Sequence, residues 1–296
     1  MTIPVLTLPW QLNSSAIATV AEDTAKLAAG GWPPELHIDF QPLGFVRPAG
    51  VVFLSNLISW LHSQGTKVLL KNIDLNTQAL VFLDDSLFFE QHCGAKRRVA
   101  AAPRATTRPL KRIAHEDSHA WLRSDLVPWL AGRLGTTTAS LHPFQNCIAE
   151  LFNNIQDHTR YDIGTIFAQH FPRENRVYVT LSDMGAGIPF NVKTAFPQLS
   201  DYQAIVKATE YGFSTKPTPR NQGIGLDYLI TQVVGQNQGT VTFCSGYSIV
   251  RFEPGPAGIQ NQELWSTGFC PGTTVDIVLR TDTIIHVPDE PEDLEW

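Results

Sequence analysis

The spacing of hydrophobic residues in the first third of the chain alternates between that of strands and that of helices. Short β-type runs occupy residues 35–40 and 67–73, and residues 50–65 between them have helical spacing and end in a glycine. Two further helical patterns, 14–31 with serines at its start and 77–94, also end in glycine. This order of strand, helix and strand predicts a βαβ unit whose two strands are parallel.

The second half of the chain predicts helices packed against a sheet. Helical periodicity covers residues 118–135 and 136–159, and shorter helices are expected at about 200–210 and 224–235. The expected strands are 163–171, 176–183, 239–245, 247–252 and 272–280. Glycine or proline separates the last three strands, which predicts an antiparallel meander. We therefore expect an α+β half with a mixed sheet covered by helices, after an α/β first half.

The composition changes sharply between these halves. Residues 94–114 contain seven Lys or Arg, two prolines and no acid. This composition predicts a solvated linker at 95–117, and the alternative is a basic arm that contacts a partner or nucleic acid. The predicted domains are residues 1–94 and 118–282, followed by an acidic tail at 283–296.

The charge and hydropathy of the whole chain restrict its partners. A formal net charge of −6 argues against nucleic acid as an obligatory partner, because phosphate binding usually requires a positive surface. No apolar run reaches the roughly 18 residues needed to span a bilayer, so we expect no membrane. The start of the chain lacks the basic region of a signal peptide, which predicts a cytoplasmic protein. The four cysteines are widely separated and match no zinc pattern.

Polar residues are concentrated on one face of the helix predicted at 136–159. Glu150, Asn154 and His158 are spaced four residues apart and share that face, with Asp157 beside them. Asn153 and Gln156 are expected to be solvated.

Two glycine-containing loops follow this helix. Residues 182–189 (SDMGAGIP) place an aspartate and two glycines after a predicted strand, and residues 212–229 (GFSTKPTPRNQGIGLDYL) end in Gly-x-Gly before a predicted helix. Each pattern alone is weak, because such glycines are common in turns and a single Gly-x-Gly is a poor phosphate signal. The three segments in this order and spacing are much more specific.

Together these segments resemble the GHKL ATPases, a superfamily that includes gyrase B, histidine kinases and, as closer relatives, the anti-sigma-factor kinases. The family's N-box resembles residues 150–158, its G1 box resembles 183–189, and its G2 box with the ATP lid resembles 212–226. The resemblance covers roughly residues 118–280. It implies a Bergerat fold, a two-layer α/β sandwich that binds ATP with Mg²⁺.

The resemblance also implies a role for each matching residue. Asn154 offers its amide oxygen to Mg²⁺, and Glu150 orients or deprotonates the water that attacks the γ-phosphate. Asp183 accepts a hydrogen bond from the adenine amino group, and Gly185 and Gly187 let the backbone turn closely around the base.

The remaining implied nucleotide contacts lie in the lid and on the polar helix face. These residues are Asp157, His158, Ser214, Thr215, Lys216, Gly223, Ile224, Gly225 and Leu226. Lys216 supplies positive charge where negative charge builds on the γ-phosphoryl group. The glycines allow close backbone approach, and the amides that open the following helix point at the anion.

The first half is similar to the STAS fold of anti-anti-sigma factors, on residues 36–61. Phosphorylatable members of that family carry Asp-Ser-Ser-Gly where a loop opens a helix. Here the matching residues are Arg47, Pro48, Ala49 and Gly50, so the phosphoacceptor hydroxyl is missing. We therefore expect this domain to act in docking or regulation.

These expectations lead to one principal functional hypothesis and two alternatives. The principal hypothesis is a Mg²⁺-dependent, slow ATPase whose lid closure switches its association with itself or with a protein partner. The alternatives are a Ser/Thr kinase that acts on a STAS-type partner, and a non-catalytic module with bound nucleotide. His115 is not expected to be a phosphoacceptor, because it lies only thirty-five residues before Glu150.

Overall fold

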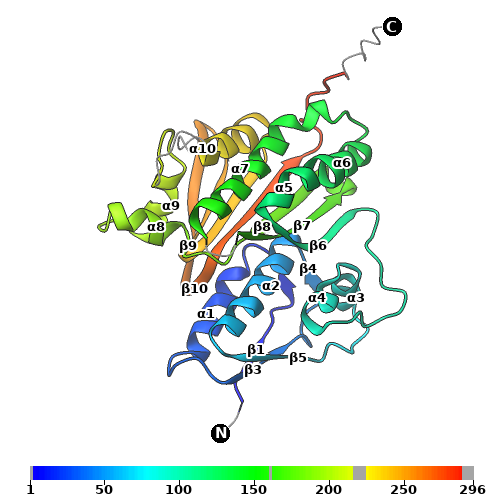
Figure 1. Cartoon of the computed structure of the whole chain (residues 1–296), viewed down its shortest axis with the longest axis vertical. Coiled ribbons are helices and arrows are strands. Elements are labelled where there is room, and N and C mark those ends of the chain that lie inside the picture. Colours follow the sequence, from blue (N-terminus) through cyan, green and yellow to red (C-terminus); the bar gives the residue numbers. More distant parts are fainter. Residues whose placement is uncertain (1–2, 160–161, 216–224, 289–296) are drawn as a thin grey trace.

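The computed structural model describes residues 3–159, 162–215 and 225–288, with only the backbone described at 265–267, and its architecture is mixed α/β (Figure 1). The α-helices are α1 (Ile17–Leu27), α2 (Pro48–Ser63), α3 (Gln78–Asp85), α4 (Phe88–Cys93), α5 (His115–Trp121), α6 (Val127–Leu134), α7 (His142–His158), α8 (Ile188–Ala195), α9 (Asp201–Ala208) and α10 (Gly225–Ile230). None of the helices in these ranges is long and apolar enough to cross a membrane.

The strands form three sheets. They are β1 (Val5–Thr7), β2 (Gln11–Leu12), β3 (Glu35–Asp39), β4 (Phe45–Val46), β5 (Lys67–Lys71), β6 (Thr107–Ala114), β7 (Ile163–Phe171), β8 (Arg176–Ser182), β9 (Thr240–Gly255) and β10 (Gly258–Arg280). The sheet orders are β1-β3-β5, β2-β4 and β6-β7-β8-β10-β9.

The first half contains the predicted βαβ unit. Strands β3 and β5 are parallel, with Glu35 opposite Lys67, and this confirms the predicted pairing. The connecting helix α2 begins with Pro48, whose ring presets the first helical φ. It ends at Ser63, two residues before Gly65, whose φ of +82° stops the helix. Strand β1 adds a third parallel strand on the other side of β3.

Two predicted helices of this half differ in detail from the structure. The helix expected at 77–94 is two helices, α3 and α4, because Leu87 between them has a φ of +64° that no right-handed helix can include. Helix α1 begins at Ile17 after Ala16, and no serine side chain caps it; the Asn13 side-chain oxygen accepts a hydrogen bond from the Ala16 amide at 3.0 Å in the preceding turn.

Two predictions about the five-stranded sheet are wrong. Each of its described pairings is antiparallel, so the prediction of a mixed sheet is wrong. The two strands expected at 239–245 and 247–252 form the single strand β9, because Gly246, with a φ of +61°, lies within the strand and does not reverse it. Strands β9 and β10 are thus one long hairpin in place of a three-stranded meander.

Both faces of the five-stranded sheet are buried. Along β7, Ile166 and Ala168 belong to the core beneath α5–α7, whereas Phe167 belongs to the core that includes α1, α2 and α3. Successive side chains of a strand point to opposite faces, so the helices α5–α7 and the first half of the chain cover opposite sides of one sheet (Figure 1). The two halves therefore share a hydrophobic core.

The segment expected to be a linker at 95–117 takes part in this sheet. Residues 107–114 form the edge strand β6 with Leu110 and Ile113 buried, and α5 begins at His115. Its basic side chains form ion pairs within the chain: Arg97 with Asp74, Arg98 with Asp84 and Asp85, Arg104 with Asp85, and Arg108 with Asp125. The four arginines are thus partly neutralised by acids of the same chain.

The first residues of the predicted acidic tail pack against the folded chain. The Thr283 hydroxyl donates to the Asn237 carbonyl at 2.7 Å, and the Val287 amide donates to the Ser140 hydroxyl at 2.8 Å. Residues 289–296 lie outside the described residues.

We predict that Asp84 is essential for stability. Its carboxylate is fully buried and accepts hydrogen bonds from the Arg97 and Arg98 amides, each at 2.9 Å, and from Arg98 Nε at 3.1 Å. Replacing it with alanine leaves these donors unpaired, so Asp84→Ala should lower the free energy of unfolding by about 3 kcal/mol in urea denaturation.

The matched control is Asp74→Ala, because the Asp74 side chain is 100% exposed although it also pairs with Arg97. This variant should change the free energy of unfolding by less than about 0.5 kcal/mol. Equal effects of the two substitutions would contradict the role of the buried carboxylate.

Candidate functional site

A large cavity of about 950 Å³ opens between α7, the carboxyl end of β8, residues 213–215 and the start of α10. Ten of the predicted site residues line it: Glu150, Asn154, Asp157, His158, Asp183, Gly187, Ser214, Thr215, Gly225 and Leu226. They come from three segments that are far apart in the sequence. The cavity has a volume typical of small-molecule sites, which span about 300–1,000 Å³.

The other predicted residues have different positions. Gly185 contributes through its backbone, since its amide donates to Asp183 Oδ1 at 2.7 Å, and a side chain there would meet Thr159. Lys216, Gly223 and Ile224 lie outside the described residues.

Helix α7 supplies most of the polar wall because of its two-sided sequence. Its apolar face is buried in the sheet core and comprises Phe144, Cys147, Ile148, Leu151, Phe152 and Ile155. Glu150, Asn153, Asn154 and Asp157 are partly exposed and face the cavity. The helix begins with Pro143 in its first turn, where the missing amide hydrogen costs nothing.

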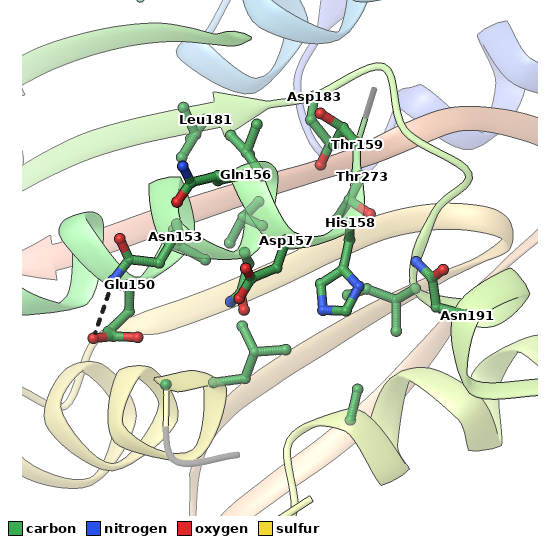
Figure 2. Close-up of a pocket in the computed structure, with 18 of the residues that line it drawn as sticks. Glu150, Asn153, Gln156, Asp157, His158, Thr159, Leu181, Asp183, Asn191 and Thr273 are labelled. Atoms are coloured by element: carbon green, nitrogen blue, oxygen red, sulfur yellow. Dashed lines mark hydrogen bonds between the residues drawn. The ribbon is translucent and has the colours of Figure 1, made fainter. Parts of the chain in front are cut away.

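One end of the cavity is centred on Glu150 (Figure 2). The Asn153 amide donates to Glu150 Oε1 at 3.4 Å, and Asn153 Oδ1 lies 3.1 Å from His115 Nε2. Because an amide oxygen only accepts, His115 is the donor in this contact. The backbone at Gly225 also comes close, since a Cβ there would lie 2.9 Å from Glu150 Oε2. Glu150 is thus a partly exposed carboxylate with an oriented side chain.

The opposite end is centred on Asp183, which follows β8 (Figure 2). The Asp183 amide donates to the Thr273 carbonyl at 2.9 Å. Two glycines allow this close packing: Gly187 has a φ of +88°, and a Cβ on Gly272, whose φ is +64°, would lie 2.0 Å from the Asp183 carbonyl oxygen. Burial raises the pKa of the Asp183 carboxyl to about 6, although the hydrogen bond from the Gly185 amide opposes this rise.

Apolar side chains line much of the rest of the cavity. They are Ile155, Leu181, Ile188, Val192, Phe213, Leu226, Phe243 and Val275. Apolar walls with a few polar groups are typical of sites that hold a flat organic ring. The cavity therefore combines polar groups on α7 with an apolar lining.

Several lining residues were not expected from the sequence. They are His115, His119, Asn153, Asn191, Tyr228 and Thr273. His115 and His119 lie on the short helix α5, which the prediction assigned partly to the linker, and Thr273 follows a β-bulge in β10. Asn153 was expected to be solvated, but the polar face of α7 is wide enough to bring it to the wall. No motif marks His115, His119 or Thr273, because only the packing of α5 and β10 against α7 and β8 brings them to the cavity.

The described side chains contain no group of three or more His, Cys, Asp or Glu that could hold a metal ion. An ion bound entirely by protein therefore does not fit here, within the part of the chain described. Mg²⁺ commonly keeps several waters and phosphate oxygens and takes only one or two oxygen ligands from protein. The amide oxygen of Asn154 at the cavity wall fits that requirement.

No protein-family model matches this chain, and no curated protein matches it.

We predict that Asp183 makes stability depend on pH in a defined direction. The folded protein keeps the Asp183 proton up to about pH 6, whereas the ordinary pKa is 3.8. The stability that this proton provides is therefore present below about pH 4 and is lost as pH rises through about 6. Asp183→Asn removes the ionisation but keeps an oxygen that can accept from Gly185.

The measurement is urea unfolding at about pH 4 and at about pH 7.5. The stability of Asp183→Asn relative to wild type should increase between these values by on the order of 1 kcal/mol, because the carboxyl still reaches solvent through the cavity. A difference that stays constant or falls with pH would contradict the raised pKa.

Proposed function

We propose that the protein is a Mg²⁺-dependent ATP-binding protein of the GHKL class, with a Bergerat-type second half that hydrolyses ATP slowly. The observation that carries the proposal is the cavity itself, which brings together the three segments that resemble the N-box, G1 box and G2 box. It has a carboxylate at each end, Glu150 and Asp183, with Asp157 and His158 between them (Figure 2).

The Asp183 end suits a purine base. A buried carboxylate oxygen accepts hydrogen bonds, and the exocyclic amino group of adenine is a donor that a carbonyl oxygen on the ring would not replace. The apolar wall, including Leu181, Ile188 and Val275, can pack against the faces of the ring. Adenine therefore fits this end better than guanine, whose carbonyl oxygen would face the carboxylate.

The Glu150 end suits the triphosphate and the hydrolytic water. Glu150 can orient a water or take its proton, and the hydrogen bond from Asn153 holds the carboxylate in one direction. Mg²⁺, when bound, would neutralise charge on the phosphate oxygens, and Asn154 is the residue that would hold it. The short α10 and the Ser214–Thr215 segment approach the same region and can bind phosphate oxygens through amides and hydroxyls.

The first half of the chain fits a STAS-like domain that acts in docking or regulation. Its parallel sheet and α2 agree with that fold, and the loop at the family's phosphoacceptor position is covered by the second half. Arg47 pairs with Glu174 at 3.0 Å and lies over the rings of Phe171 and Tyr178. Phosphotransfer to this loop within one chain is therefore disfavoured, which supports hydrolysis coupled to association with a protein partner or a second copy.

We predict that Glu150 is required for hydrolysis but not for binding. Glu150→Gln keeps the shape of the side chain and removes its charge, so it should reduce phosphate release from ATP by at least about 100-fold. ATP affinity, measured by calorimetry with Mg²⁺ present, should change by less than about threefold, because Glu150 acts on the attacking water and is not needed to bind the nucleotide.

The control is Glu116→Gln, an exposed carboxylate on α5 that does not line the cavity. It should hydrolyse ATP at the wild-type rate. If Glu150→Gln hydrolysed ATP at the wild-type rate, Glu150 would not be the residue that activates the water. Labelled phosphate transferred to a STAS-type protein, with none released, would favour the kinase alternative.

We predict that Asp183 recognises the base. Asp183→Asn should weaken ATP binding by about tenfold, as expected for a lost hydrogen bond to a charged group. Wild-type affinity should also fall as pH drops below about 6, where the carboxyl is protonated. Inorganic tripolyphosphate, which has no base, should bind both proteins equally. Equal ATP affinity of the two proteins would contradict the assignment.

A further inference from the structure

Asn56 is a polar residue buried where the two halves of the chain meet. It lies in the middle of α2, and its side chain is 2% exposed among mostly apolar neighbours on the same helix. Its side-chain nitrogen donates two hydrogen bonds across the interface, to the Asp183 carbonyl and to the Pro271 carbonyl, both at 2.9 Å. Both amide hydrogens of Asn56 are thus used on the second half of the chain.

The two carbonyls belong to segments that build the Asp183 end of the cavity: Asp183 follows β8, and Pro271 lies at the β-bulge within β10. Gly272, next to Pro271, packs directly on the Asp183 carbonyl, and its own carbonyl accepts from the Ser245 hydroxyl at 2.8 Å. The same hydroxyl accepts from the Ile188 amide at 3.0 Å, at the start of α8. Asn56 therefore joins α2 to a network that connects the end of β8 with the interior of β9 and the bulge in β10.

Three hydrogen bonds hold Asp183 in position. Its amide is held by the Thr273 carbonyl, its carboxyl accepts from the Gly185 amide, and its carbonyl accepts from Asn56. The first two contacts lie within the second half of the chain. The third is the contact that comes from the first half, and without it the carbonyl would keep only the longer hydrogen bond of 3.5 Å from the Ser182 hydroxyl.

We propose that Asn56 is a positioning residue for base recognition, so that α2 of the first half completes the base-binding end of the nucleotide site. This inference rests on the proposed function. Asn56 does not touch the cavity; it acts through the backbone of Asp183 and of the bulge at Pro271–Gly272 in β10. Because Arg47 at the start of α2 is also bound to Glu174, a partner that displaces α2 would change how Asp183 meets the base.

The test compares ATP with tripolyphosphate on the full-length protein. Asn56→Asp keeps the shape of the side chain but cannot donate to a carbonyl, so it should weaken ATP binding by about tenfold and leave tripolyphosphate binding unchanged. A structural defect without a role in base recognition would weaken the binding of both ATP and tripolyphosphate, or of neither. Asn56→Leu, which is similar in size and carries no charge, is the second variant and keeps the test decisive if Asn56→Asp does not fold.

The matched control is Ser55→Ala, one residue earlier on the same helix. Ser55 is 1% exposed and is bound by Gln91 and His92 of α4, on the side away from the cavity. Its substitution should alter stability without changing the preference for ATP over tripolyphosphate.

A double-substitution cycle tests whether Asn56 acts through Asp183. In an Asp183→Asn background, Asn56→Leu should weaken ATP binding by less than about twofold, because the interaction that Asn56 positions is already lost. Additive effects, or Asn56 variants that bind ATP as the wild type does, would overturn the inference. A wild-type protein that binds no ATP would instead overturn the proposed function.

Discussion

The five-stranded antiparallel sheet imposes the main constraint on this protein, because both of its faces are buried by other parts of the described chain. Along β7, β9 and β10, apolar side chains that point one way fill the core under α5–α7, and those that point the other way join the core with α1, α2 and α3. Antiparallel sheets commonly leave one face in water, but here the first half of the chain covers that face. The two halves are therefore parts of one folded unit.

The same constraint explains the polar residues inside the interface. The face of the sheet toward the first half carries Asp276, which accepts from the Thr180 hydroxyl at 2.7 Å, and Ser182, which lies 2.8 Å from the Thr274 hydroxyl. Burial raises the pKa of the Asp276 carboxyl to about 6. Polar groups that are hydrogen-bonded to each other can be buried, and their directional bonds make the packing of the two halves specific. Asn56 belongs to this interface and donates to the backbone of Asp183, which lines the cavity.

The prediction from sequence succeeded where a local pattern decides the structure. The β-type run at 163–171 corresponds to β7, and the periodicity at 136–159 corresponds to α7, which begins at His142, because strand and helix spacing are properties of adjacent residues. The errors arose where contacts distant in sequence prevail. Gly246 suggested a turn, but pairing with β10 carries β9 straight through it, and the basic residues of 107–114 concealed an edge strand whose two apolar positions are buried.

The sequence by itself determined which segments carry polar chemistry: the face of α7 with Glu150 and Asn154, the aspartate and glycines after β8, and the segment before α10. Their spacing within a helix or turn is set by local geometry, and this was sufficient to predict ten of the residues that line the cavity. Only the tertiary structure decided that His115 reaches Asn153 and that Asn56 reaches the Asp183 carbonyl. These contacts join residues 38 and 127 positions apart, and they depend on how helices pack on a sheet, which no short pattern encodes.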